Sequence, residues 1–289
     1  MSLYRTIYNN IVLFILSIVV ICILLSIIPD RTLYEYSFID RFWNVISIII
    51  FFEYGDSLVT SYSVWETAIS GAIKSLSLLF GSLFLIISIS VVIAYLIAFH
   101  SYNKTVKVVT NLLERISSIP ILIWATILLF ISYVTLSIVP IYNDITGFNK
   151  TTYLAIGLPI LAITIGDNVL GDAINRLYYT ISQFNNNAYV TALRSRGIKI
   201  RFHLIRNIIP EIMNVLSTRI SYLIGGMIVI EFVFNWQGLG WLTWQSIIRD
   251  GEKDYGLIIL CSIMILLLIV IINIVKDITY RICHPNLFD

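Results

Sequence analysis

Three acidic side chains lie inside long apolar segments, where few charged groups are found. Asp167 and Asp172 are five residues apart in one segment, and Glu231 lies near the end of another. An ionised acid at the middle of a bilayer costs about 2.5 to 3.5 kcal/mol on insertion scales, so such side chains usually face protein or water. A carboxylate in that position can bind a cation, exchange a proton or accept hydrogen bonds from a neighbouring helix.

Two interpretations of these acids stay open. In one, they line a pathway through the membrane, and the small residues Gly225 and Gly226 belong to the same pathway or to its gate. In the other, Asp172 lies at the membrane surface and Asp167 accepts hydrogen bonds from a neighbouring helix, while the two glycines let helix backbones pack closely. For Asp172 we prefer the second interpretation. For Asp167 the sequence favours neither of the two.

The chain carries no motif for catalysis or cofactor binding. A G-x4-G-K-[ST] phosphate loop, an HExxH motif and a CxxC pair are all absent from the sequence. Cys22, Cys261 and Cys283 have no spacing typical of a disulfide framework or a metal site. We therefore predict no catalytic residue, no cofactor and no metal site, and we expect any ATP hydrolysis to come from a partner chain.

A basic, polar segment at residues 176–212 separates two of the apolar segments. It contains six basic residues and one acid, Glu211. The sequence predicts a helix from Asn187 to Ser195 and a turn at Gly197, where glycine adopts positive φ at little cost. It predicts a second helix after this turn, broken near Pro210. Such a helix pair outside the membrane predicts a rigid knob that docks on a soluble partner. A basic loop that only obeys membrane topology is the alternative.

The elements that must position these residues are membrane-spanning helices. Hydrophobic residues make up 58% of the 289 residues, charged residues only 12%, and the mean hydropathy is +0.89. Soluble domains carry about 25% charged residues. Apolar segments of about 20 residues predict spans. We predict six, at residues 11–28, 72–99, 112–139, 153–175, 213–234 and 256–275.

Two details qualify these spans. Pro120 is expected to kink the third span near its start. The segment WNVISIIIFF, which follows the first span, is too short to cross a bilayer and predicts an interfacial or packed helix.

The distribution of basic residues predicts the orientation. With the N-terminus inside, 13 of the 19 lysines and arginines lie on the inner side and 6 on the outer side. Because cytoplasmic loops carry the excess of positive charge, the six-span arrangement predicts that both termini and the 176–212 segment are cytoplasmic. Residues 30–70 and the segment after the fifth span, which contains Trp236, Trp241 and Trp244, then face outward, and the tryptophans are expected in an interfacial aromatic belt.

The basic segment resembles the EAA loop of ABC-importer permeases, E-A-A-x3-G-x9-I-x-L-P. Gly197 and Pro210 take its Gly and Pro positions, and Ala192 its first Ala, although the Glu and the second Ala are absent. YVTALRSRG, which begins at Tyr189, is similar to the Y-V-x-x-A-R-x-K-G variant of the oligopeptide, dipeptide and nickel permease family.

Two further segments resemble the same family. EFVFNWQGLGWL at 231–242 is similar to E-x-V-F-x-W-P-G-L-G-x-L, with Gln237 in place of Pro. NIVKDITYRICHPN at 273–286 is similar to N-L-x-x-D-x-x-Y-x-x-x-D-P-R, with His284 in place of Asp. The resemblance covers roughly residues 70 to 286.

This resemblance implies an all-α, polytopic fold, the type I ABC-importer transmembrane domain with a cytoplasmic coupling helix. It divides the chain into an N-terminal membrane anchor and extracytoplasmic loop (1–70), the transmembrane domain (71–280) and a cytoplasmic tail (281–289). It implies a bacterial plasma-membrane permease for peptides, nickel or metal–chelator complexes. The implied partners are a second related permease, two ATPase subunits and an extracytoplasmic binding protein.

The resemblance also assigns roles to particular residues. Those implied to couple the permease to the ATPase are Tyr189, Ala192, Arg194, Arg196, Gly197 and Pro210. Glu231 matches the family's Glu before V-F, which implies a structural or gating role rather than a contact with substrate. A secondary transporter driven by an ion gradient, with Asp167 and Glu231 as coupling acids, is the alternative function.

Overall fold

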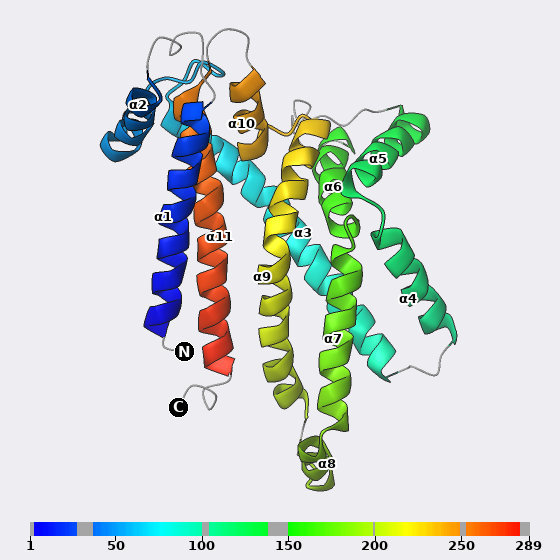
Figure 1. Ribbon diagram of the computed structural model, residues 1–289. Helices are drawn as coiled ribbons and strands as arrows, with labels where there is room; N and C mark the ends of the chain where they lie inside the picture. The colour runs from blue at the N-terminus through cyan, green and yellow to red at the C-terminus, as the bar shows by residue number, and fades with distance from the viewer. Residues whose placement is uncertain are drawn as a thin grey trace.

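The computed structural model describes residues 3–27, 37–99, 104–137, 150–198, 200–248 and 253–283. Within these ranges the chain is α-helical, and strand pairing is limited to an isolated bridge between Asp56 and Ser63. The predicted all-α fold is therefore confirmed. In chain order (Figure 1) the helices are α1 (Leu3–Ile27), α2 (Phe38–Phe51), α3 (Val64–Phe99), α4 (Lys104–Ser117), α5 (Ile121–Leu136), α6 (Lys150–Ile165), α7 (Val169–Asn186), α8 (Ala188–Ser195), α9 (Arg201–Val233), α10 (Leu239–Ile248) and α11 (Tyr255–Cys283).

Among the described residues, three helices are long and apolar enough to cross a membrane alone, namely α1, α3 and α11. Two helix pairs satisfy the same test together but are sharply bent, α4 with α5 by 97° and α6 with α7 by 56°. The predicted fifth span lies within α9, whose apolar part, Tyr222–Val233, is shorter than the roughly 20 residues a span needs. By length and composition, the described helices therefore give up to five spans.

The third and fourth predicted spans are both interrupted. The kink expected at Pro120 is present, since α4 ends at Ser117 and α5 begins directly after the proline. In the fourth predicted span, at 153–175, the chain breaks between α6 and α7, which no sequence pattern predicted. Asp167 and Asn168 have φ of 53° and 57° there, a left-handed conformation that Asp and Asn tolerate better than most residues. Pro159, in contrast, remains inside α6.

The break predicted near Pro210 is also wrong, because α9 runs through this proline as one helix of 33 residues. Proline removes a single N–H from the helix, and packing of the surrounding turn can keep the helix from ending there. Ile208 supplies such packing, since it is 9% exposed and belongs to a buried cluster with Leu177 and Ile181 of α7. At 1.5 Å per residue, the 33 residues of α9 correspond to a length of about 50 Å along the helix.

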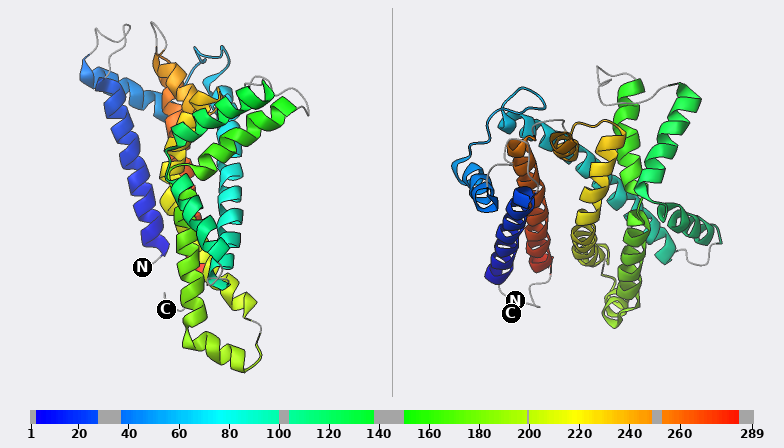
Figure 2. Two further views of the ribbon diagram at one scale, coloured as in Figure 1. Left: turned by 90° about the vertical axis from the view of Figure 1, so that its right-hand side faces the viewer. Right: turned by 45° about the horizontal axis from the view of Figure 1, so that its top comes forward.

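The helices form a bundle with α7 and α9 near its middle and α3 crossing behind them (Figure 1). The pair α1 and α11 lies on one flank, and α2, the helix expected around WNVISIIIFF, packs against it. α10 lies at one end of the bundle and α8 at the other. The start of α1 and the end of α11 are both at the α8 end (Figure 2).

The predicted domain division has no break of its own in the structure. The boundary at residues 70 and 71 falls inside α3, and the boundary at 280 and 281 falls inside α11. The division therefore stays a prediction based on the resemblance.

Candidate functional site

α8 is a short helix that projects beyond the ends of α7 and α9 (Figures 1 and 2). Asn187 begins it, because the Asn187 side chain accepts a hydrogen bond from the Tyr189 N–H at 3.1 Å. Val190 and Leu193 face the protein and are 0% and 8% exposed. These contacts hold the helix in place while its other side stays open.

A glycine turn ends α8. Gly197 has φ of 69°, its N–H donates to the Arg194 carbonyl at 3.0 Å, and the Ile198 N–H donates to the Leu193 carbonyl at 3.1 Å. These are the two bonds of a Schellman cap. No atom of the described residues lies within 4 Å of the position that a Cβ on Gly197 would take. Backbone conformation, and not crowding, therefore favours glycine here. The predicted helix and glycine turn are confirmed.

Five of the six residues predicted to couple to the ATPase lie on this element, which we call the α8 knob (residues 187–198). Tyr189, Ala192, Arg194, Arg196 and Gly197 are all exposed. Tyr189 Oη lies 3.1 Å from His203 Nδ1 of α9, and Arg194 donates to Asn185 Oδ1 at 3.2 Å. The sixth, Pro210, is buried within α9, outside the knob.

The break between α4 and α5 and the break between α6 and α7 are joined by backbone hydrogen bonds. The Asp167 N–H donates to the Ile119 carbonyl at 3.2 Å, and the Asn168 N–H donates to the Ser117 carbonyl at 2.6 Å. In return, the Asp167 carboxylate accepts from the Ile121 N–H at 3.1 Å. Asp167 thereby caps the start of α5, which matches the interpretation in which it accepts a hydrogen bond from a neighbouring helix.

Gly226 of α9 lies beside the same junction. A Cβ on Gly226 would lie 2.9 Å from Ile121 Cδ1 and 3.8 Å from Asp167 Oδ2. Gly225 is exposed, with no atom of the described residues within 4 Å of its Cβ position, and Asp167 is exposed too. The structure therefore brings Asp167, Gly225 and Gly226 to one region, where a role in the pathway stays a prediction. Asp172, one turn into α7, accepts from Asn168 Nδ2 at 3.3 Å.

Glu231 lies elsewhere, fully buried at the α10 end of α9. Its carboxylate accepts hydrogen bonds from the N–H groups of Gly240 at 2.8 Å and Trp241 at 3.0 Å, in the first turn of α10. It also accepts from the hydroxyl of Ser75 on α3, and Ser75 Oγ in turn accepts from the Leu239 N–H at 2.8 Å. We call this set the Glu231 clamp, because it joins α3, α9 and α10.

The motif around Glu231 can be explained by the clamp. A Cβ on Gly238 would come within 3.0 Å of both the Glu231 carboxylate and Ser75 Oγ, so only glycine fits. The expectation that Trp236 belongs to an interfacial aromatic belt is wrong, since it is 3% exposed and its Nε1 donates to the Lys74 carbonyl at 3.0 Å. Trp244, 46% exposed and in edge contact with Phe232, fits that expectation better.

Sequence reasoning missed Ser75 completely. A serine in an apolar helix gives no signal of its own, and its partner Glu231 is 156 residues away. Within the described ranges, no three His, Cys, Asp or Glu side chains are grouped so that they could hold a metal ion. The features described are thus a projecting capped helix, a junction of helix breaks and a structural clamp.

Residues 90–289 match the sequence model of a family described as "Binding-protein-dependent transport system inner membrane component". The chain is 26% identical over 239 residues to the metal-staphylopine import system permease protein CntB of Staphylococcus aureus strain Mu50, covering 82% of this chain and 73% of that protein. It is 24% identical over 254 residues to the nickel import system permease protein NikB of Staphylococcus aureus strain USA300, covering 86% and 73%.

A third similarity is shorter. The chain is 27% identical over 136 residues to the putative peptide permease protein BOV_A0351 of Brucella ovis, covering 46% of this chain and 41% of that protein. The family match takes in more than half of the chain, including the α8 knob, both helix breaks and Glu231. The chain therefore belongs to the binding-protein-dependent transport system inner membrane components, and it is a multi-pass membrane permease of the ABC-importer class.

Proposed function

We propose that this chain is one of two related permease subunits of an ATP-driven importer, and that the α8 knob transmits motion from ATPase subunits to the spans. The observation that carries this proposal is a capped helix that projects from the bundle and leads, through a glycine turn, into the 33-residue α9. A contact that passes on a displacement has to be stiff. The Asn187 cap and the Schellman cap give α8 defined ends.

α9 supports a route for that motion. It begins beside the α8 knob and ends at the Glu231 clamp, without a break at Pro210. A displacement of the knob therefore reaches α10 through one continuous helix. Alternating access follows if closure of the ATPase pair draws the two knobs of a permease pair together and opens the α10 end.

Orientation and cargo complete the proposal. The α8 knob, the start of α1 and the end of α11 lie at one end of the bundle, and the excess of basic residues supports placing that end in the cytoplasm. An extracytoplasmic binding protein then meets the α10 end. Relatives are named for metal-staphylopine, nickel and peptides, so we propose cargo from these classes. Family membership gives no support to the ion-gradient alternative.

A matched pair of glycine replacements tests the coupling role. Gly197 and Gly55 have φ of 69° and 70°, and in the described part of the chain neither would place a Cβ within 4 Å of another atom. Valine at either position therefore imposes a similar backbone strain of about 1 to 3 kcal/mol, but only Gly197 lies on the knob. In proteoliposomes with the ATPases and the binding protein, Gly197→Val is expected to lose ATPase binding and uptake, and Gly55→Val to keep ATPase binding. Wild-type ATPase binding and uptake by Gly197→Val would refute the proposal.

A further inference from the structure

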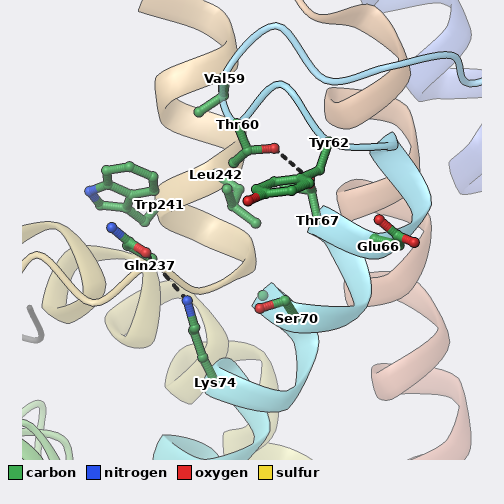
Figure 3. A pocket seen from close by; sticks show the side chains of 11 residues that line it. Val59, Thr60, Tyr62, Glu66, Thr67, Ser70, Lys74, Gln237, Trp241 and Leu242 are labelled. Atoms are coloured by element: carbon green, nitrogen blue, oxygen red, sulfur yellow. Dashed lines mark hydrogen bonds between the residues drawn. The ribbon is translucent and has the colours of Figure 1, made fainter. Parts of the chain in front are cut away.

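A pocket with a volume of about 420 Å³ opens at the α10 end of the bundle (Figure 3). Its lining comes from three segments, namely the loop between α2 and α3, the first turns of α3, and the segment from Gln237 into α10. The volume falls within the range of small-molecule sites, about 300 to 1,000 Å³. None of the groups assigned above to the knob or to the helix breaks lines it.

The loop wall of this pocket is fixed by a buried acid. Asp254 is 4% exposed, and its carboxylate accepts hydrogen bonds from Ser57 Oγ at 3.0 Å and from the Leu58 N–H at 2.8 Å. The same carboxylate accepts from the Leu257 N–H at the start of α11, at 3.0 Å. The loop is therefore tied to a helix that is distant in sequence, and its shape does not depend on a ligand.

The opposite wall is fixed by the Glu231 clamp and by contacts around Lys74. The Lys74 carbonyl accepts from the indole of Trp236, and Lys74 Nζ donates to Gln237 Oε1 at 3.3 Å. Thr60 and Thr67 close the pocket from the loop side through a hydroxyl contact of 2.6 Å. Sites whose walls are held by such supporting bonds bind ligands without the cost of ordering them.

The charges of the pocket have a regular arrangement. Glu66, Ser70 and Lys74 follow one another at intervals of four residues on α3, and all three line the pocket. Residues spaced in this way share one helix face. Figure 3 shows Ser70 between Glu66 and Lys74 along α3. Eight residues of helix separate their Cα atoms by about 12 Å, so one wall presents a negative and a positive group far enough apart to bind two ends of one molecule.

Aromatic and apolar side chains form much of the remaining lining, and Figure 3 shows Tyr62 and Leu242 between Lys74 and Glu66. Tyr62, Trp241 and Leu242 line the pocket, and Figure 3 shows the Trp241 indole facing the pocket from the α10 side. Rings of this type present a large apolar surface with few rotatable bonds. The pocket is therefore dipolar along α3 and apolar in its middle.

We propose that this pocket binds a zwitterionic organic molecule. The carboxylate of the ligand lies at Lys74 and the Gln237 amide, and its ammonium group lies at Glu66. Its apolar middle packs against Tyr62 and Leu242. The proposal depends on the proposed function only in placing the pocket on the outer side of the membrane.

The test uses ω-amino acids of increasing chain length as probes, with the alkyl carboxylate and the alkylamine of each length as controls. Titration calorimetry of the purified full-length chain in lipid nanodiscs leaves both faces accessible, so the result does not depend on orientation or on transport. We expect saturable binding of the ω-amino acids with a preferred length, and weaker binding of both control compounds.

Charge removal identifies the two ends of the site. Lys74→Gln is expected to weaken ω-amino acid binding about tenfold and to abolish the preference over the alkylamine. Glu66→Gln is expected to weaken it similarly and to abolish the preference over the alkyl carboxylate. These reciprocal losses of preference also show that each variant is folded. Lys253→Gln and Glu53→Gln remove charges that do not line the pocket and are expected to bind as wild type does.

Three results would overturn the inference. The first is that no ω-amino acid binds saturably to the wild-type chain. The second is that the alkyl carboxylate binds as tightly as the ω-amino acid of the same length. The third is that Lys253→Gln and Glu53→Gln weaken binding as much as Lys74→Gln and Glu66→Gln do. Because none of these measurements involves ATPase subunits, the ligand site and the coupling role of the α8 knob can fail independently.

Discussion

Replacing Glu231 by alanine removes the acceptor of three hydrogen-bond donors, which are Ser75 Oγ and the N–H groups of Gly240 and Trp241. In a fully buried site, each donor left without a partner costs about 1 to 3 kcal/mol. Water that enters the space left by the side chain recovers part of this loss, so we expect a net loss of about 3 kcal/mol in the attachment of α10. Since 1.4 kcal/mol is a factor of ten, the population with α10 detached rises about 100-fold.

Cys261 provides the assay. It is 0% exposed and belongs to the apolar cluster that includes Leu239 and Leu242 of α10. A thiol reagent can reach it only after α10 moves, so the labelling rate under native conditions reports local opening. With Cys22 and Cys283 replaced by alanine, Glu231→Ala is expected to increase the labelling rate of Cys261 about 100-fold.

Two controls separate the clamp from general destabilisation. Glu231→Gln keeps an oxygen for the α10 N–H groups and an amide that can donate to Ser75, so it loses mainly the charge at the helix start, about 1 kcal/mol. It is expected to label about fivefold faster than wild type. Cys22 is buried in a separate cluster with Val45 and Ile259. In a chain that keeps only Cys22, Glu231→Ala should leave the labelling rate of Cys22 unchanged. If Cys261 in Glu231→Ala labels no faster than in wild type, Glu231 does not hold α10.

Three further predictions concern the clamp, the helix breaks and the topology. Gly238→Ala places a Cβ against the Glu231 carboxylate and Ser75 Oγ. It is therefore expected to speed Cys261 labelling in the wild-type background, and to speed it less in Glu231→Ala, where only the clash with Ser75 remains, as a double-mutant cycle would show. Asp167→Ala removes the acceptor for the Ile121 N–H. The loss of this cap, about 1 kcal/mol, is expected to speed hydrogen exchange at the start of α5 about fivefold. Asp167→Asn keeps an acceptor and is expected to exchange as wild type does, so equal effects of the two changes would point to a role for the charge instead. Cysteine at Glu53 is expected to react with an impermeant thiol reagent from outside and cysteine at Asn186 only after permeabilisation, in a chain without the native cysteines, and labelling from the same side would contradict the proposed orientation.

Features encoded by neighbouring residues were predictable. Asn187 and Gly197 are capping residues at the two ends of α8, and their preference for these positions depends only on local backbone geometry. The kink at Pro120 has the same origin, since a proline restricts the residue before it. The apolar composition likewise predicts the helical, membrane-embedded architecture without knowledge of contacts.

Features encoded by distant contacts were not predictable. The break between α6 and α7 depends on hydrogen bonds from Asp167 and Asn168 to the α4–α5 turn, which no local pattern reveals. The continuity of α9 at Pro210 depends on packing of Ile208 against α7. The burial of Trp236 depends on the Lys74 carbonyl of α3. In each case, the sequence identifies a residue with unusual preferences, while its distant partner decides the outcome.

The long-range ties at the α10 end also have a consequence for biogenesis. Ser75 is 156 residues ahead of Glu231 in the chain, and Ser57 is 197 residues ahead of Asp254. At about 5 to 20 residues per second, the ribosome needs roughly 8 to 40 s to produce the later partner of each pair. During that time α3 is already made, but neither tie can form. The end of the bundle that carries the pocket therefore stays incomplete until residue 254 has been made, and a chain that terminates before residue 231 cannot close it.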